Sequence, residues 1–480
     1  MKRFFILLFI LVIAAVSCTK DNETPVESPA PVFLSSSPSS GQTDVDVEGL
    51  KITLKFDQNV SCPSQTRSQI TLVPDAEIIS FDAHDKGLYL AAGGTLEYET
   101  LYTLTIPSGC VKGLQENQKV PETIRITFTT EAAPVGPTHY ELNPSATLSN
   151  ASASASAKKV YDFLLAQSGQ KTLSGVQSQG TANNNEFANT IATRTGKHPA
   201  LAGYDFIFEH YSPTPASWSW KIDYSDMSAP IEQWNSGGLV SYMWHWNVPT
   251  SEAAYIAGRD NLDFDGWNFY TDKTAFDIRE LLKEGTWQHD YALAEMDKVA
   301  DYLKILKDNG VPVLWRPFHE ASGNIYSIWK GDAWFWWGRY GAEPCKALWK
   351  LMYERFTTVH GLDNLIWVWT IDYTAGAEED ALEWYPGDAY VDIVGTDIYA
   401  DNTDSQKACW QFLVDVTKGR KLVAVTECGN IPDPSKCFAA GEKWSWWMVW
   451  SDDYALNTET YWKTLMKSSY TITRESMPSL

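Results

Sequence analysis

The chain has 480 residues, enough for two or three domains of ordinary size. It carries 38 Lys and Arg against 60 Asp and Glu, so its formal net charge is −22, and this excludes nucleic acid or an anionic lipid surface as the main partner because both would be repelled. A hydrophobic content of 44% with 20% charged residues indicates a folded globular protein and not a disordered one.

The first residues have the features of an export signal. A cationic start is followed by a 13-residue apolar run, Phe4 to Val16, which is too short to span a bilayer and fits a signal-peptide core. The run ends in Ala15-Val16-Ser17-Cys18, which resembles a bacterial lipobox, so residues 1–17 are predicted to be a signal peptide and Cys18 the lipidated residue. An ordinary signal peptide with a chance Cys is the alternative.

The segment after Cys18, Thr19-Lys20-Asp21-Asn22-Glu23, resembles the short acidic signal of surface lipoproteins in Bacteroidetes. We therefore expect an outer-membrane lipoprotein, displayed on the cell surface or facing the periplasm. No other apolar run reaches 18 residues, so this lipid is the only membrane attachment that we predict.

A polar tether is expected at residues 18–31, and residues 32–131 have the pattern of a small all-β domain. Apolar and polar residues alternate with a period of two in three short runs, at 52–56, 102–106 and 124–128. Ser37-Pro38-Ser39-Ser40-Gly41 resembles the opening of bacterial immunoglobulin-like domains, which implies a β-sandwich. Such a domain serves as a spacer or as a sugar-binding module.

Six cysteines remain if Cys18 is lipidated, namely Cys62, Cys110, Cys345, Cys409, Cys428 and Cys437. Cys62 and Cys110 fall in the same predicted domain, where an oxidising compartment would allow them to pair. No two have the spacing of a zinc or redox motif, so we expect no metal site from cysteines.

After a Pro-rich linker at 132–139, residues 140–480 alternate apolar strands with helices. Eight strands are predicted, at 172–178, 200–208, 238–246, 311–318, 365–371, 391–398, 421–427 and 445–450. Helices are predicted near 158–167, from Asp290 to a stop at Asn309-Gly310, and from Pro344 to Gly361. This α/β pattern predicts a (β/α)8 barrel with enlarged loops. A doubly wound sheet is the alternative, but no Gly-rich phosphate loop follows any strand.

Two of the predicted strands end in a glutamate, at Glu320 after strand four and at Glu427 after strand seven. The active site of such a barrel lies at the C-terminal strand ends. A pair of carboxyl groups there is what glycoside cleavage needs, since one must donate a proton to the leaving oxygen while the other stays ionised. Burial and mutual repulsion separate the two pKa values. The alternative is that both are solvated loop residues.

Arg316 precedes Glu320 by four residues, so on one strand the two point to the same side, and its guanidinium can hold Glu427 ionised. A salt bridge inside the barrel is the alternative explanation for Arg316. His319 is compatible with a ligand, a hydrogen-bond donor or a core histidine.

Four motifs together resemble family 26 of the glycoside hydrolases, most of which are β-mannanases. They are Arg-Pro-x-His-Glu at 316–320, Trp-Phe-Trp-Trp-Gly at 334–338, Thr-Asp-Ile-Tyr at 396–399 and Thr-Glu at 426–427. The resemblance implies a retaining (β/α)8 barrel with Glu320 as general acid/base and Glu427 as nucleophile. It also implies that His245 and Tyr399 contact the central sugar or the nucleophile, that Trp334 stacks at the cleavage point, and that Trp450 lies beneath the central sugar.

Placement along the strands supports these roles. Tyr399 follows strand six, beside strand seven, and its hydroxyl can reach Glu427, whereas a buried tyrosine bonded to backbone is the alternative. His245 follows strand three, beside strand four; for it and for Trp334 a place in the core is the alternative. The 22 tryptophans as a whole fit a Trp-rich core or flat platforms for sugar rings equally well.

The chain departs from the family pattern in two places. The loop 321–333 between His-Glu and the Trp-rich segment is longer, and its Tyr326 and Trp329 can lengthen the wall of the cleft. Ser451 stands where some members of the family have an arginine that binds the next sugar.

The predicted function is therefore endo-acting cleavage of β-1,4-linked mannan, galactomannan or glucomannan by a monomer without cofactor or metal, although the sequence does not exclude exo action. The same reaction on β-glucan or xylan is the nearest alternative. A non-catalytic surface glycan-binding protein is an alternative of another class. A metal-dependent hydrolase using His245, His319 and Glu320 is a third.

Overall fold

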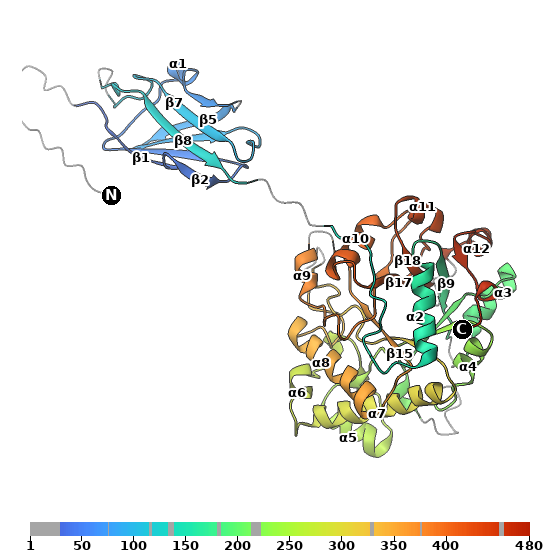
Figure 1. Ribbon diagram of the computed structural model, residues 1–480. Helices are drawn as coiled ribbons and strands as arrows, with labels where there is room; N and C mark the ends of the chain where they lie inside the picture. The colour runs from blue at the N-terminus through green and yellow to red at the C-terminus, as the bar shows by residue number, and fades with distance from the viewer. Residues whose placement is uncertain are drawn as a thin grey trace, which may run out of the picture. The chain divides into compact units, whose positions relative to one another are not determined.

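In a computed structural model of the chain, residues 29–74, 76–114, 118–132, 139–179, 184–212, 222–326, 331–374, 377–450 and 456–480 are described. The contacts divide the chain into two compact units, Met1–Pro137 and Thr138–Leu480 (Figure 1). The predicted signal peptide and Cys18 lie outside the described residues. No helix within these ranges is long and apolar enough to cross a membrane.

The first unit is a sandwich of two four-stranded sheets, ordered β1-β3-β6-β5 and β2-β8-β7-β4. Its elements are β1 (Phe33–Ser37), β2 (Gln42–Val45), β3 (Lys51–Phe56), α1 (Ser64–Arg67), β4 (Thr71–Val73), β5 (Ile78–His84), β6 (Gly87–Ala92), β7 (Leu101–Ile106) and β8 (Ile124–Thr130). Alternate residues of β3, β7 and β8 are buried, as the period of two predicts, so the expected immunoglobulin-like sandwich is confirmed. Cys62 and Cys110 are both buried in its core as free thiols, so the disulfide considered from the sequence is not formed.

The second unit is a closed barrel of eight parallel strands. They are β9 (Thr172–Gln177), β10 (Leu201–Asp205), β11 (Leu239–Met243), β14 (Val313–Arg316), β15 (Leu365–Thr370), β16 (Ile393–Ile398), β17 (Leu422–Cys428) and β18 (Trp444–Val449). Each pairs in parallel with the next, and β18 and β10 both pair with β9, which closes the ring. The prediction of eight strands and a (β/α)8 barrel is confirmed, and closure excludes the open doubly wound sheet.

Helices surround this barrel, and the first of them, α2 (Ala155–Gln167), covers its N-terminal end, where it packs against residues at the starts of the strands (Figure 1). The others are α3 (Glu186–Thr195), α4 (Ser228–Asn235), α5 (Glu252–Asn261), α6 (Ile278–Leu281), α7 (Trp287–Asp308), α8 (Ala342–Glu354), α9 (Glu378–Leu382), α10 (Lys407–Val416), α11 (Pro434–Ala439) and α12 (Glu459–Met466). Three short strands complete the unit: β12 (Val248–Pro249), β13 (Trp267–Asn268) and β19 (Thr471–Ile472).

The helix ends follow the capping residues. Helix α7 begins at Trp287, three residues before the predicted start at Asp290, because the hydroxyl of Thr286 accepts a hydrogen bond from the backbone N–H of His289 at 3.1 Å. Its predicted stop is present, since Gly310 with φ +72° follows its end. Helix α2 begins at Ala155, three residues before the expected start, because the hydroxyl of Ser154 accepts from the N–H of Ala157 at 3.2 Å. The capping residues therefore determine the first residue of each of these two helices, which the apolar period alone does not define.

Most tryptophans belong to the core. Fourteen of those in the described residues are buried, which decides in favour of the Trp-rich core for the bulk of them. Trp334 and Trp450 are different, since both line the cavity at the C-terminal end of the barrel.

Candidate active site

The backbone leaves the barrel sharply before Glu320. Strand β14 ends at Arg316, and both Phe318 and Glu320 have left-handed backbone with φ of +50° and +49°. The sequence-based expectation that Arg316 and Glu320 share one strand is therefore wrong. Such a conformation costs a non-glycine residue about 1–2 kcal/mol, so the surrounding packing must hold this turn in place.

That packing is aromatic. Phe318 is buried against Trp246, Trp337 and Trp349, and the indole N–H of Trp337 donates to the carbonyl of His319 at 2.9 Å. The Trp-rich segment also approaches the turn closely at Gly338, where a Cβ atom would lie 1.7 Å from a backbone oxygen of the turn. The Trp-Phe-Trp-Trp-Gly motif thus supports the turn that aims Glu320 into the cleft.

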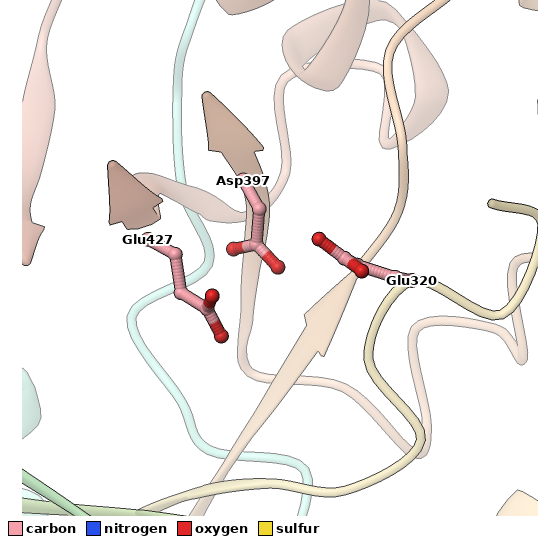
Figure 2. A group of neighbouring side chains, drawn as sticks. All are labelled: Glu320, Asp397 and Glu427. Atoms are coloured by element: carbon pink, nitrogen blue, oxygen red, sulfur yellow. The ribbon is translucent and has the colours of Figure 1, made fainter. Parts of the chain in front are cut away.

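Three carboxyl groups converge at this end of the barrel. Glu320 comes from the turn after β14, Asp397 from β16 and Glu427 from β17, and one oxygen of each lies within 4.8 Å of the others (Figure 2). A register shift between Thr396 and Asp397 places Asp397 opposite Glu427. The structure therefore brings together the two predicted glutamates and adds an aspartate that the sequence analysis did not select.

One guanidinium binds two of these carboxylates. Arg316, fully buried, donates from Nη1 to Asp397 Oδ2 at 3.1 Å and from Nη2 to Glu427 Oε1. The hydroxyl of Thr426 donates to Asp397 Oδ1 at 2.7 Å. The expected contact between Arg316 and Glu427 is present, and the salt bridge also reaches Asp397, whose only signal in the sequence was its place in the Thr-Asp-Ile-Tyr motif.

Tyr399 completes the shell around Glu427. Its hydroxyl donates to Glu427 Oε2 at 2.8 Å, as its place after strand six suggested, while half of the side chain remains exposed in the cleft. The two oxygens of Glu427 are thus held by different donors, and the carboxyl plane is fixed.

The pKa values of both glutamates are raised. Burial, followed by the charge of Asp397, raises the pKa of Glu427 to about 7, while Arg316, His245 and Tyr399 oppose this rise. Burial and the carboxylates of Asp397, Asp372 and Glu427 raise the pKa of Glu320 well above its ordinary value, against Arg316. Both carboxyl groups therefore hold a proton to a higher pH than a free glutamate does, while Arg316 and Tyr399 favour the charged form of Glu427.

Asp372, just beyond the end of β15, is another carboxyl that the sequence analysis missed. Burial and the charge of Asp397 raise its pKa to about 8, and its buried Oδ2 has no hydrogen-bond partner among the described residues. An aspartate two residues past a strand has no local signal that separates it from a solvated loop residue.

His245 and His319 form a pair at the floor of the cleft. Their Nε2 atoms lie 3.1 Å apart, and Nδ1 of His245 lies 2.6 Å from Asp205 Oδ2. Burial, then His245 and Arg316, lowers the pKa of His319 well below its ordinary value. Asp205, at the end of β10, was not selected from the sequence because its partner is 40 residues away along the chain.

The remaining cleft wall is aromatic. A cavity of about 420 Å³ is lined by His245, Tyr270, His319, Glu320, Trp334, Phe335, Tyr399, Glu427 and Trp450. The indole N–H of Trp334 donates to Glu320 Oε2 at 3.1 Å, and the ring of Trp450 lies 5.8 Å from that of His245. Tyr270 is a cleft residue that the sequence analysis missed; Trp329 and Ser451 lie outside the described residues.

The long loop after Glu320 is attached to the barrel through Tyr326, whose hydroxyl accepts a hydrogen bond from the indole N–H of Trp384 at 3.0 Å.

The three carboxyl groups are hard oxygen donors of the type that a divalent cation prefers. Arg316 already pairs with two of them, so their negative charge is partly neutralised from within the protein. His245 and His319 do not join this group, since their Nε2 atoms face one another. The arrangement allows one carboxyl group to transfer a proton to a substrate that lies between the two, while the other carboxyl group attacks that substrate as a nucleophile.

The comparisons with known proteins agree with this geometry. The model of glycosyl hydrolase family 26 matches residues 149–476, and that of a bacterial Ig-like domain matches residues 27–130. A mannan endo-1,4-β-mannosidase of Thermothelomyces thermophilus is 35% identical over 396 residues, 82% of this chain and 72% of that protein. The chain spans about half the length of another such relative, mannan endo-1,4-β-mannosidase B of Piromyces sp., at 34% identity over 337 residues, 69% of this chain.

Among solved structures, the family 26 domain of an endo-β-mannanase/endo-β-glucanase from Prevotella bryantii is 36% identical, with a TM-score of 0.62 over 69% of this chain and 99% of that one. A β-mannanase from a symbiotic protist of the termite Reticulitermes speratus, solved with a gluco-manno-oligosaccharide, is 33% identical, with a TM-score of 0.59 over 71% of this chain and all of that one. The family model covers most of the chain, and the C-terminal end of the barrel carries two glutamates. This chain, which has a bacterial Ig-like domain before its barrel, therefore belongs to family 26 of the glycosyl hydrolases.

Proposed function

We propose that the chain is a retaining endo-β-1,4-mannanase in which Glu427 is the nucleophile and Glu320 the general acid/base. The observation that carries the proposal is the approach of these two carboxyl groups, one oxygen of each within 4.8 Å of the other, at the floor of an open cleft. Retaining enzymes hold their carboxyl groups about 5–5.5 Å apart, whereas inverting enzymes need about 6.5–9.5 Å to admit a water molecule.

In the first step Glu427 attacks C1 of the sugar, and the bond from C1 to the leaving oxygen breaks as Glu320 gives that oxygen its proton. In the second step Glu320 takes a proton from water, the water oxygen bonds to C1, and Glu427 leaves as a carboxylate. The surroundings of the two groups support these roles, since burial and three neighbouring carboxylates raise the pKa of Glu320, while Arg316 and Tyr399 favour the charged form of Glu427.

The cleft walls fit a sugar chain. The exposed faces of Trp334 and Tyr399 and the ring of Trp450 offer apolar surface to the C–H bonds of sugar rings, and His245 offers a ring nitrogen. We infer that Trp334 contacts the sugar at the cleavage point, while Trp450 and His245 contact the central sugar.

The names of the relatives support a mannan as substrate, and reducing-sugar release from a panel of polysaccharides tests it. We expect cleavage of mannan, galactomannan or glucomannan with a rapid fall in viscosity, which marks attack within the chain. Faster cleavage of mixed-linkage β-glucan or xylan would replace the proposed substrate but keep the mechanism. Release of single sugars without loss of viscosity would contradict endo action.

Two rival functions are tested in the same assay. A non-catalytic glycan-binding protein would bind mannan and release no reducing ends during a long incubation, which would contradict the proposal. A metal-dependent hydrolase would lose activity in excess chelator, whereas we expect full activity to remain because the reacting groups are carboxyl groups.

We also propose that the mature chain acts as a monomer attached to the outer membrane through a lipid on Cys18, with the Ig-like domain as a spacer from the cell surface. The motif at residues 15–18 supports this attachment. Incorporation of labelled palmitate in the wild type and its loss in Cys18→Ala would test it, and protease treatment of intact cells would distinguish surface display from a periplasmic location.

A further inference from the structure

Asp205 binds His245 at two points. Its Oδ1 accepts the backbone N–H of His245 at 3.0 Å, and its Oδ2 lies 2.6 Å from Nδ1 of the ring. Both residues are buried, with 3% and 9% of their surfaces exposed, so water competes little for these contacts. One carboxylate therefore fixes the backbone and the ring of His245 together.

Asp205 is itself held rigidly. The side-chain amide of Gln179 accepts the backbone N–H of Asp205 at 3.0 Å and donates to its carbonyl at 3.1 Å. The hydroxyl of Tyr224 donates to the same carbonyl at 2.5 Å. These contacts fix the backbone from which the carboxylate projects, so His245 is held against an anchored residue.

The hydrogen positions in the histidine pair follow from this contact. A carboxylate only accepts hydrogen bonds, so Nδ1 of His245 carries the hydrogen. In the neutral ring Nε2 is then an acceptor, and the hydrogen in the 3.1 Å contact belongs to Nε2 of His319. Nδ1 of His319 is buried without a hydrogen-bond partner in the described part of the chain. Leaving that nitrogen without a hydrogen avoids an orphaned buried N–H group, which is rare in proteins.

We propose that Asp205 is a positioning residue that fixes the tautomers of His245 and His319 and thereby holds the turn that carries Glu320. The inference rests on the proposed function, because Glu320 directly follows His319 and acts there as the acid/base. Its physical basis is the chain of contacts from the Asp205 carboxylate through two rings to the backbone of the turn.

The substitution Asp205→Asn tests this chain with little change of shape. The asparagine amide that replaces Oδ2 donates a hydrogen bond, which favours His245 with the hydrogen on Nε2. Two N–H groups would then face one another across the pair unless His319 also changes its tautomer and buries an unpartnered N–H. We expect kcat/KM on β-mannan to fall about 10²-fold, mainly in kcat, since small displacements of a reacting group have effects of this size.

Asp392→Asn is the matched control. Asp392 is equally buried and accepts two backbone N–H groups, from Ser149 at 2.5 Å and Trp367 at 2.8 Å, but it precedes β16 at the opposite end of the barrel. We expect its loss to lower the melting temperature and leave kcat within about twofold. An equal loss of kcat in both variants would overturn the proposal, because the effect would then be general destabilisation.

A spectroscopic measurement decides the inference independently of activity. In protein labelled with ¹⁵N-histidine, with signals assigned through His245→Gln and His319→Gln, the ring nitrogen shifts report which nitrogen is protonated. We expect protonated Nδ1 in His245 and protonated Nε2 in His319 of the wild type, and altered shifts of both in Asp205→Asn. If the variant does not fold, the wild-type shifts decide, and a bare Nδ1 in His245 overturns the inference. If the wild type cleaves no polysaccharide, the proposed function fails, while these shifts still decide whether Asp205 sets the tautomers.

Discussion

Trp334 donates its indole N–H to Oε2 of Glu320 at 3.1 Å while 38% of its surface remains exposed in the cleft. The ring lies against Gly323, where a Cβ atom would come within 2.2 Å of it. The hydrogen bond occupies one oxygen of Glu320 and leaves Oε1 to carry the transferable proton. One side chain therefore orients the Glu320 carboxyl group and leaves a ring face open to the cleft.

Replacing Trp334 by Phe separates these two contributions. The ring face is kept and the hydrogen bond, worth about 1 kcal/mol, is lost. We expect kcat/KM on mannan to fall about fivefold in Trp334→Phe and considerably further in Trp334→Ala, which also loses the sugar contact. Equal losses in the two variants would contradict a role for the indole N–H. Steady-state kinetics on soluble galactomannan measures both.

The proposed roles of the two glutamates predict that their variants differ in which substrates they still cleave. Glu320→Ala should lose about 10²–10⁴-fold in rate on polysaccharide but retain turnover of an aryl glycoside, whose leaving group needs no proton. Glu427→Ala should lose both activities, with partial recovery when azide replaces the missing nucleophile. Equal losses of Glu320→Ala on both substrates would contradict its role as the acid.

The proposed roles of Glu427 as a charged nucleophile and Glu320 as a protonated acid predict a bell-shaped pH profile for kcat/KM. Activity should rise as Glu427 ionises, with a midpoint near 7, because burial and Asp397 raise its pKa to about 7. It should fall at higher pH as Glu320 loses its proton, since its pKa is raised well above the ordinary value. Activity that is already maximal at pH 5 would contradict the raised pKa of Glu427.

Asp372 predicts a pH dependence of stability. Its pKa is raised from 3.8 to about 8 in the folded protein, mainly by burial, so its protonated form favours folding. This contribution is fully present below about pH 4 and is lost as the pH rises towards 8. Asp372→Asn should therefore raise the melting temperature above that of the wild type at pH 8 and change it little at pH 4, measured by calorimetry. A variant less stable than the wild type at pH 8 would contradict the prediction.

Arg316 predicts a large cost for breaking a buried ion pair. Arg316→Met leaves Asp397 and Glu427 without their shared cation, so we expect a loss of about 3–5 kcal/mol in the free energy of unfolding and loss of activity. Arg420→Met is the control, because its pair with Asp388 is about half exposed and should contribute at most about 1 kcal/mol. Urea denaturation of both variants checks the difference, and similar losses would contradict the role of burial.

The sequence predicted the barrel because its signals are local. Each of the eight strands is a short apolar run between polar segments, and α7 and its stop at Asn309-Gly310 could be recognised from the apolar period and the terminating glycine. Glu320 and Glu427 could be selected because both stand at the ends of such runs and within motifs of the family. The exact start of α2 depended on the hydroxyl of Ser154, which the period does not register.

Tertiary structure decided what surrounds the two glutamates. Asp372 and Asp205 have no distinctive neighbours in sequence, and Asp397 was marked only by the Thr-Asp-Ile-Tyr motif. Asp397 contacts Arg316 and Asp205 contacts His245, both from far away along the chain, and Asp372 is affected by burial and by the charge of Asp397. The left-handed turn at Phe318 and Glu320 could not be recognised from the sequence, because it contains no glycine. Its strain is offset by packing against tryptophans that lie elsewhere along the chain.

The amino-acid order by itself determined the succession of strands and helices and the two acidic strand ends, since hydrophobic period and turn chemistry act over a few residues. Only the closed barrel decided which oxygen faces which proton, because hydrogen bonds and electrostatic interactions act over a few ångströms in space and take no account of separation along the chain.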